Sequence, residues 1–126
     1  MATKQAQTVQ LGAYTGRTRD QGLLGDFNLL SANGAIPVNQ PGRYQITKAG
    51  VCALTLAAPS LADEGETYQI ISTTANAHTI TATGLFADGA GHVNLATFAA
   101  QIGASIQFQA IGGKWYVTDL QGVTMS

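Results

Sequence analysis

The sequence has few charged residues, and this shortage argues against several kinds of function. Only 10% of its 126 residues are Asp, Glu, Lys or Arg, against about 25% in an ordinary soluble domain. The basic residues are scattered rather than clustered: Lys4, Arg17, Arg19, Arg43, Lys48 and Lys114. Because a protein that neutralises nucleic-acid phosphates needs clustered Lys and Arg, we expect no nucleic acid as a ligand. A formal net charge of -1 gives little repulsion between copies, which favours an assembled protein.

Cysteine and long apolar runs are also scarce. Cys52 is the only cysteine, so one chain can form neither an internal disulfide nor a multi-thiolate metal site. We expect Cys52, in the run VCALTL, to be a small buried hydrophobe. The first ten residues lack the apolar region of a signal peptide, and no stretch approaches the roughly 18 apolar residues of a membrane span. The sequence therefore predicts a soluble protein that is not exported and has no membrane partner.

Residues 1–42 sustain neither a helical nor a strand period, and several glycines interrupt them. We interpret this stretch as an extended N-terminal arm. It carries more apolar side chains than a solvated tail would: Leu23, Leu24, Phe27, Leu29, Leu30 and Ile36. Two alternatives are open for these side chains. They pack either on the chain's own β domain or a sister subunit, or on a different protein.

Residues 43–126 change to short runs with period-two alternation, which is typical of strands with one face in a core. The expected strands are RYQITK, VCALTL, TYQIIST, HTITAT, HVNLATF, ASIQFQA, KWYVTDL and GVTMS. Two hairpins are expected: residues 67–73 with 78–83, and residues 104–110 with 114–120 through Gly112-Gly113. About seven or eight short strands predict an all-β fold, an antiparallel β-sandwich or jelly-roll-like domain, with a small barrel as an alternative.

No catalytic spacing is readable in the chain, so we expect no enzyme. His78 and His92 are the only histidines, and no GxSxG elbow, HExxH helix or P-loop accompanies them. We expect both to be structural, although a trimer could gather copies of one histidine around its axis. Asp63, Glu64 and Glu66 cluster in LADEGET, but their spacing matches no calcium loop. We therefore predict a solvated turn there, and we expect no metal and no cofactor.

Trp115 and Tyr116 point to opposite faces of one expected strand, so only one of them can lie in the core of a half-buried sheet. We expect Trp115 to be the core residue. The other aromatic ring is then exposed or in a subunit interface. Aromatic rings on a β surface can stack on sugars, which keeps a carbohydrate-binding alternative open. The outward faces are rich in Thr and Gln, which suits either subunit contacts or an ordinary exposed sheet.

Three short motifs stand out in the second part of the chain: AHTIT at residues 77–81, ATFAA at 96–100 followed by GAS at 103–105, and GKWYV at 113–117. With the residues around them, they make residues 42–126 resemble small β-domain proteins encoded among the virion structural genes of tailed bacteriophages. Such proteins include capsid decoration (cement) proteins, which are commonly trimers that sit on the outer shell and clamp neighbouring capsomers. Related modules occur in head fibres and tail parts.

The resemblance implies a virion structural protein on the capsid surface, a homotrimer whose partner is the major capsid protein. The arm lies outside the resemblance. In this hypothesis the arm helps to attach the protein to the shell through Arg17, Arg19, Leu23, Leu24 and Phe27. The alternative is a glycan- or receptor-binding module of a head fibre or tail, with Trp115 or Tyr116 as the stacking platform.

Overall fold

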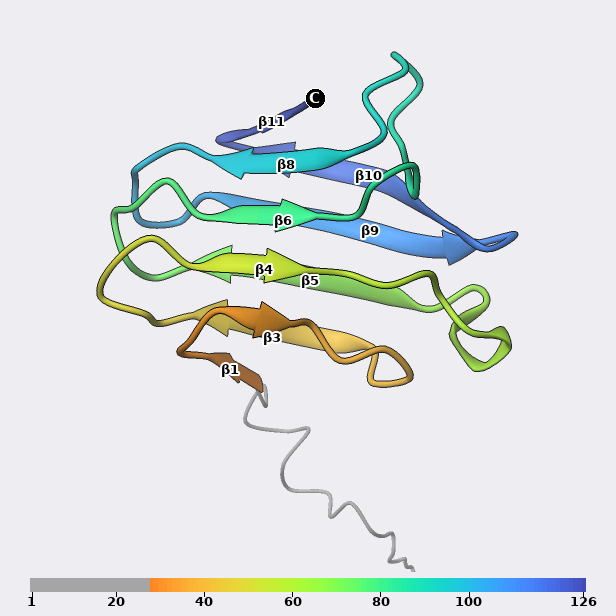
Figure 1. Cartoon of the computed structure of the whole chain (residues 1–126), viewed down its shortest axis with the longest axis horizontal. Helices are drawn as coiled ribbons and strands as arrows, with labels where there is room; N and C mark the ends of the chain where they lie inside the picture. Colours follow the sequence, from red (N-terminus) through yellow and green to blue (C-terminus); the bar gives the residue numbers. More distant parts are fainter. Residues whose placement is uncertain (1–27) are drawn as a thin grey trace, which may run out of the picture.

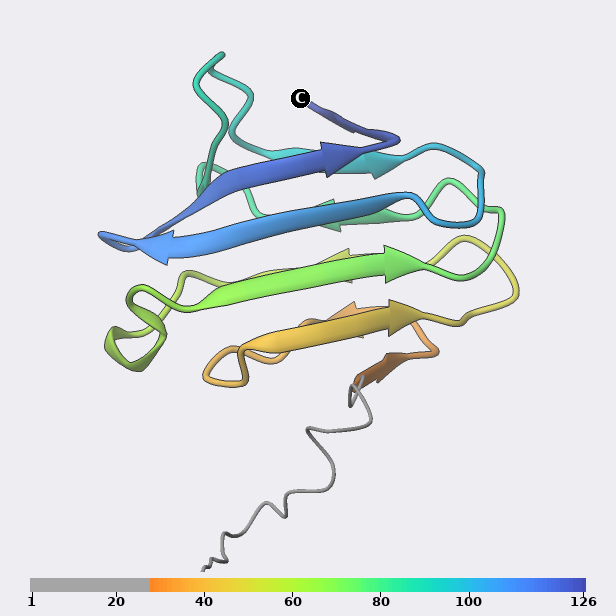
Figure 2. The same ribbon diagram turned by 180° about the vertical axis from the view of Figure 1, so that it is seen from behind.

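The computed structural model describes residues 28–126, which form two β-sheets that lie face to face (Figures 1 and 2). Sheet A has the strand order β1–β3–β5–β9–β10–β7. Its strands are β1 (Asn28–Leu30), β3 (Gly42–Ile46), β5 (Thr67–Ser72), β9 (Ser105–Ile111), β10 (Lys114–Gln121) and β7 (Phe86–Ala87). Sheet B has the order β11–β8–β6–β4–β2. Its strands are β11 (Val123–Met125), β8 (Leu95–Phe98), β6 (Thr79–Thr81), β4 (Ala53–Thr55) and β2 (Gly34–Ala35).

The prediction of an all-β fold is confirmed for this part of the chain, which contains no α-helix and one short 3-10 helix, η2 (Leu61–Asp63). Eight of the strands coincide with the eight runs expected from the sequence. The additional strands β1, β2 and β7 have only two or three residues each. Such short segments carry no measurable period, which is why the sequence pattern missed them.

The chain winds from one sheet to the other and back, so that successive strands from β1 to β9 lie alternately in sheet A and sheet B. Strands β1, β3 and β5 therefore pair in parallel, as do β2, β4 and β6. Parallel neighbours need a crossover connection, and each crossover here contains a strand of the opposite sheet. This winding is typical of β-solenoids.

The remaining pairings make both sheets mixed, which corrects the antiparallel arrangement predicted from the sequence. Strands β8 and β11 extend sheet B by antiparallel pairing, and β9 and β10 do the same in sheet A. The pairing of β7 with β10 is parallel. A period of two shows which side of a strand is apolar, but it does not show the direction of the neighbouring strand.

One of the two expected hairpins exists. Strands β9 and β10 pair antiparallel, with Ile111 opposite Lys114, and both residues of the turn, Gly112 and Gly113, have positive φ angles of 58° and 81°. Only glycine adopts such a pair of angles readily. The hairpin predicted between residues 67–73 and 78–83 is wrong, because β5 lies in sheet A and β6 in sheet B. The apolar faces of β5 and β6 pack against each other across the core, and the two strands are not neighbours in one sheet.

The described part of the predicted arm belongs to the β domain. Strand β1 pairs with β3, and β2 pairs with β4. Leu30 and Ile36 are 8% and 2% exposed and join the common core. These two apolar side chains thus pack on the chain's own domain, and the fold includes residues from Asn28 onward.

Aromatic rings fill the inner face of sheet A. Tyr68 stacks on Tyr44 and on Phe108, with ring centroids 6.0 and 5.7 Å apart, and Trp115 meets Tyr68 edge-on at 5.1 Å. Trp115 is fully buried, and its Nε1–H donates to the carbonyl oxygen of Ala57 at 2.9 Å. Trp115 is therefore a core residue, as expected, and it links sheet A to the loop after β4.

We expect Phe108→Ala to destabilise the protein by about 3–5 kcal/mol, because it leaves a cavity among the rings of sheet A. Phe108→Leu, which keeps most of the volume, should cost less. Gln107→Ala on the outer side of the same strand is the matched control and should stay within about 0.5 kcal/mol of wild type. Urea unfolding checks all three variants. Equal losses for Phe108→Ala and Gln107→Ala would contradict this account of the core.

Candidate functional site

The residues predicted to bind the partner lie outside the described part of the chain. They are Arg17, Arg19, Leu23, Leu24 and Phe27. The residues singled out in the β domain, from residue 43 onward, all lie within the described part of the chain. They fall into two groups. Asp63, His78 and Cys52 are buried, whereas His92, Glu64, Glu66 and Tyr116 are exposed.

Asp63 corrects the prediction of a solvated turn. Its carboxylate is fully buried and accepts hydrogen bonds from the backbone N–H groups of Asn39 and Ser60 and from the hydroxyls of Ser60 and Tyr68. Burial alone would raise the pKa of Asp63, but these hydrogen bonds together hold it below the ordinary carboxyl value. The Ser60-x-x-Asp63 spacing is that of a capping box, a signal that could have identified this carboxylate as structural.

His78 is also a structural link. Its Nδ1 accepts the backbone N–H of Cys52 at 3.0 Å, so the neutral ring carries its proton on Nε2. Nε2 lies 2.9 Å from the hydroxyl oxygen of Thr74, which in turn donates to the carbonyl oxygen of Lys48. Burial lowers the pKa of His78. Through both ring nitrogens, the side chain links the segment between β3 and β4 to the loop between β5 and β6.

The remaining titratable groups do not gather around either buried residue. His92 lies in the loop between β7 and β8, where its Nδ1 is 3.0 Å from a carboxylate oxygen of Asp88. The Cys52 thiol is buried and donates to the carbonyl oxygen of Ala32, and burial raises its pKa. Across residues 28–126, no group of three or more His, Cys, Asp or Glu side chains is placed to hold a metal ion. In the same range, no helix is long and apolar enough to cross a membrane.

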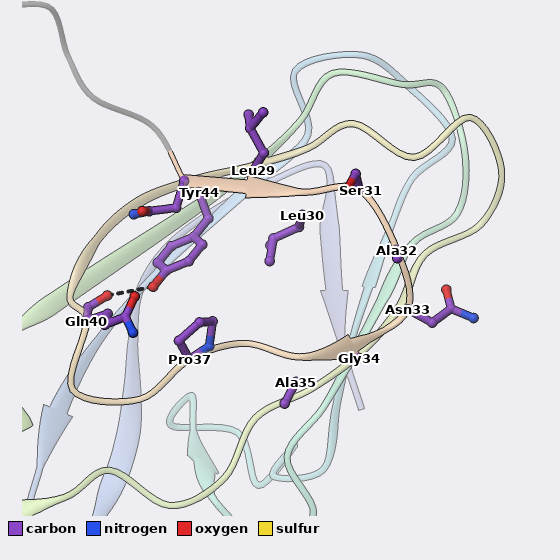
Figure 3. A pocket seen from close by; sticks show the side chains of 11 residues that line it. Leu29, Leu30, Ser31, Ala32, Asn33, Gly34, Ala35, Pro37, Gln40 and Tyr44 are labelled. Carbon is purple, nitrogen blue, oxygen red and sulfur yellow. Dashed lines mark hydrogen bonds between the residues drawn. The ribbon is translucent and has the colours of Figure 1, made fainter.

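Residues 28–41, which contain β1 and β2, make the first turn of the winding chain and are called the first coil here. The first coil ends in a hollow of about 530 Å³ (Figure 3). Strands β1 and β2 and the loops around them line it. Leu30, Pro37 and Tyr44 form its floor, and Leu29 on the neighbouring position of β1 lines its outer edge. The hydroxyl of Tyr44 donates to the carbonyl oxygen of Gln40 at 2.7 Å across the hollow. Apolar floor and polar rim together make this end a candidate docking surface.

The outer edges of β1 and β2 frame this hollow. In the described residues each is the last strand of its sheet, so no strand pairs with its outer side there. Edge strands offer backbone N–H and C=O groups to an added segment. Leu29, on β1, is 64% exposed. The residues 1–27 join the domain at this same edge, directly before Asn28.

The outer faces of the two sheets differ in chemistry. The outer face of sheet B carries no charged side chain; its residues are Ala35, Ala53, Thr55, Thr79, Thr81, Leu95, Thr97 and Thr124. The outer face of sheet A is rich in glutamine, and it also carries Arg43, Lys114, Asp119 and the ring of Tyr116, which is 43% exposed. The prediction of Thr- and Gln-rich outward faces therefore applies to two separate surfaces.

Comparison with known proteins gives no relative from which to transfer a function: no family model matches the chain, and no curated protein matches its sequence.

We expect Asp63→Asn to lower the free energy of unfolding by about 1–3 kcal/mol at neutral pH, because the amide cannot accept every hydrogen bond that the carboxylate accepts. The wild-type contribution should be complete above the ordinary carboxyl pKa of 3.8 and disappear as the pH falls through the lower pKa of folded Asp63. The difference between variant and wild type should therefore shrink below about pH 4.

Urea unfolding at a series of pH values between 7 and 3 measures this difference. His78 is present in both proteins, so its own titration cancels. Glu66→Gln, which neutralises an exposed carboxylate, should stay within about 0.5 kcal/mol of wild type at neutral pH. A difference between Asp63→Asn and wild type that stays constant down to pH 3 would show that the charge of Asp63 is not the cause.

Proposed function

We propose that this protein is a capsid decoration (cement) protein of a tailed bacteriophage, a homotrimer on the virion surface that binds the major capsid protein across capsomers. The resemblance of residues 42–126 to virion structural proteins suggests the class of partner. The structural observation that carries the proposal is the open end of the first coil. Two strand edges with which no described strand pairs, an exposed leucine and a hollow with an apolar floor lie there, where residues 1–27 join the domain.

In this proposal the two ends of the chain have different tasks. The β-sandwich made by the two facing sheets supplies subunit packing. Residues 1–27, with Arg17, Arg19, Leu23, Leu24 and Phe27, attach the trimer to the shell beside the edge of β1. An added interface across a capsomer joint raises the free energy needed to separate the capsomers against internal DNA pressure. No bond is made or broken, so no catalytic group is required.

The threonine face of sheet B supports the trimer. Its row Thr79, Thr97 and Thr124 lies in register across β6, β8 and β11. Threonine hydroxyls both donate and accept hydrogen bonds, and no ion must be desolvated when such a face is covered. Together with the neighbouring strand edges, this face suits contact with another copy of the chain.

Deleting residues 1–27 should leave the β domain folded and abolish attachment to capsids, because the first described strand begins at Asn28 and the first described core residue is Leu30. Circular dichroism checks the fold, and sedimentation of the truncated protein with undecorated capsids of the same phage checks attachment. A full-length protein with Leu23, Leu24 and Phe27 changed to Ala should attach more weakly than wild type. Retention of full occupancy by the truncated protein would refute this role for the segment.

Light scattering coupled to size-exclusion chromatography should give about three times the chain mass of 13.0 kDa. Thr97→Glu, in the middle of the threonine row, should lower that mass by placing three charges in the subunit contact. Thr118→Glu on sheet A, at an exposed position, is the matched control and should leave the trimer intact. A monomeric wild-type protein, or a trimer that tolerates Thr97→Glu, would contradict the assignment of the threonine face.

A further inference from the structure

We propose that the outer face of sheet A binds a neutral oligosaccharide. The face lies in front in Figure 2, over β3, β5, β9 and β10. The inference does not depend on attachment to a capsid, because it rests on residues 42–120 and not on the first coil. Its failure would therefore leave the proposed function standing, and the reverse is also true.

A row of polar side chains crosses this face at right angles to the strands. Arg43 lies opposite Gln69, Gln69 opposite Gln107, and Gln107 opposite Asp119. The pleat places one such side chain on each strand, about 4.8 Å from the next. A glutamine amide offers two N–H donors and a carbonyl acceptor, so the row presents donors and acceptors at intervals comparable to the length of one sugar ring.

The face is hollowed along this row. A hollow of about 320 Å³ is lined by Gly42, Arg43, Thr67, Gln69 and Gln107, and it falls at the lower end of the roughly 300–1,000 Å³ of small-ligand sites. Gly42 has no side chain, and a Cβ atom built there would meet nothing within 4 Å. The φ angle of Gly42 is 135°, a conformation that few residues with a side chain adopt.

A second hollow continues the row on its other side. It has a volume of about 290 Å³ and is lined by Asp88 and residues 117–120 of β10. A β-bulge between Val117 and Asp119 interrupts the register there, and the Thr118 hydroxyl donates to the carbonyl oxygen of Gln107. The bulge turns Asp119 back into line with Gln107, so that both hollows border the same row of side chains.

Tyr116 supplies the apolar surface that sugar recognition also needs. It lies opposite Gln109, which in turn lies opposite Thr67. These three residues form a second row beside the row that contains Gln107. The Gln109 amide is already oriented, because its Nε2 donates to the carbonyl oxygen of Gly65 at 2.9 Å. Its carbonyl oxygen is thereby fixed as an acceptor beside an exposed aromatic ring. Pyranose rings present one apolar side to such a ring and hydroxyls to the surrounding amides.

The charges and the shape of the face favour a neutral sugar over an acidic one or over another copy of the chain. Arg43 and Asp119 stand at opposite ends of the row, and Lys114 on β10 and Asp88 beside the second hollow add one charge of each sign. The formal charges cancel, so the site has no net charge to attract an ionic ligand. The four strands carry two to four outward residues each and cover roughly 400 Å², about half of the ~800 Å² that each partner buries in a standard protein interface. Hollows that would be left unfilled against a flat protein surface suit a small polar ligand.

The test uses the full chain on an array of neutral and acidic oligosaccharides, followed by calorimetric titration with the neutral oligosaccharide that gives the strongest array signal. Tyr116→Ala and Gln69→Ala should each weaken binding about tenfold or more. Tyr116→Phe keeps the ring and should retain most of the affinity. Thr81→Ala, on the outer face of sheet B, is the matched control and should bind like wild type.

Light scattering of the same variants separates a sugar site from a subunit contact. Neutral-sugar binding that Tyr116→Ala and Gln69→Ala weaken, with an unchanged molar mass, supports the proposal. Three results would overturn it: no binding by the wild type, binding to acidic sugars only, or a fall in molar mass in these two variants without any sugar binding. The last result would identify the face as a contact between copies.

Discussion

The fold depends on a continuous row of aromatic rings across the inner face of sheet A. Each strand from β3 to the β7 edge contributes one ring: Tyr44, Tyr68, Phe108, Trp115 and Phe86, each in contact with at least one other. Rings of this size bury large apolar areas and favour defined stacked or edge-on geometries. Because successive residues of a strand point to opposite faces, the inner row also determines which residues reach the outer face. Arg43, Gln69, Gln107, Gln109 and Tyr116 face outward because their neighbours are these rings.

Buried polar groups hold the successive coils in place. Asp63 joins the loop after β2, through Asn39, to the loop before β5, and it also accepts the Tyr68 hydroxyl of the aromatic row. His78 joins the start of β4 to the loop between β5 and β6. A solenoid is stabilised mainly by contacts between neighbouring coils, and unsatisfied polar groups in those contacts would be costly. Asp63 and His78 therefore act as fixed hydrogen-bonded connections between coils rather than as acids or bases.

The alternation of residues such as Tyr44, Ile46, Leu54, Ile70 and Ile80 allowed the strands and their buried faces to be predicted, since burial on one side leaves a period of two. The connections between the strands leave no comparable pattern in the sequence. Tyr68 and Ile80 are buried whether their strands form a hairpin or lie in facing sheets. The alternation of apolar residues therefore could not distinguish a hairpin from a crossover. Asp63 was misjudged because its partners, Asn39 and Tyr68, come from other parts of the chain. The hollow at the first coil was missed because β1 and β2 are too short to show a period.

The winding also separates the surfaces that can acquire a function. One turn of the chain places a strand in each sheet. The inward-facing residues of both sheets must pack together in one core, whereas the residues that face outward from sheet A and from sheet B can vary independently. Among the described residues, the end of the first coil is a third surface, because a solenoid has no closed edge at its ends. Attachment at that end occupies neither sheet face. A trimer that packs through the outer face of sheet B would therefore still present Tyr116 and the row that contains Gln69 and Gln107 to solvent. A single small domain could then attach to a shell, form a trimer and bind a sugar at the same time.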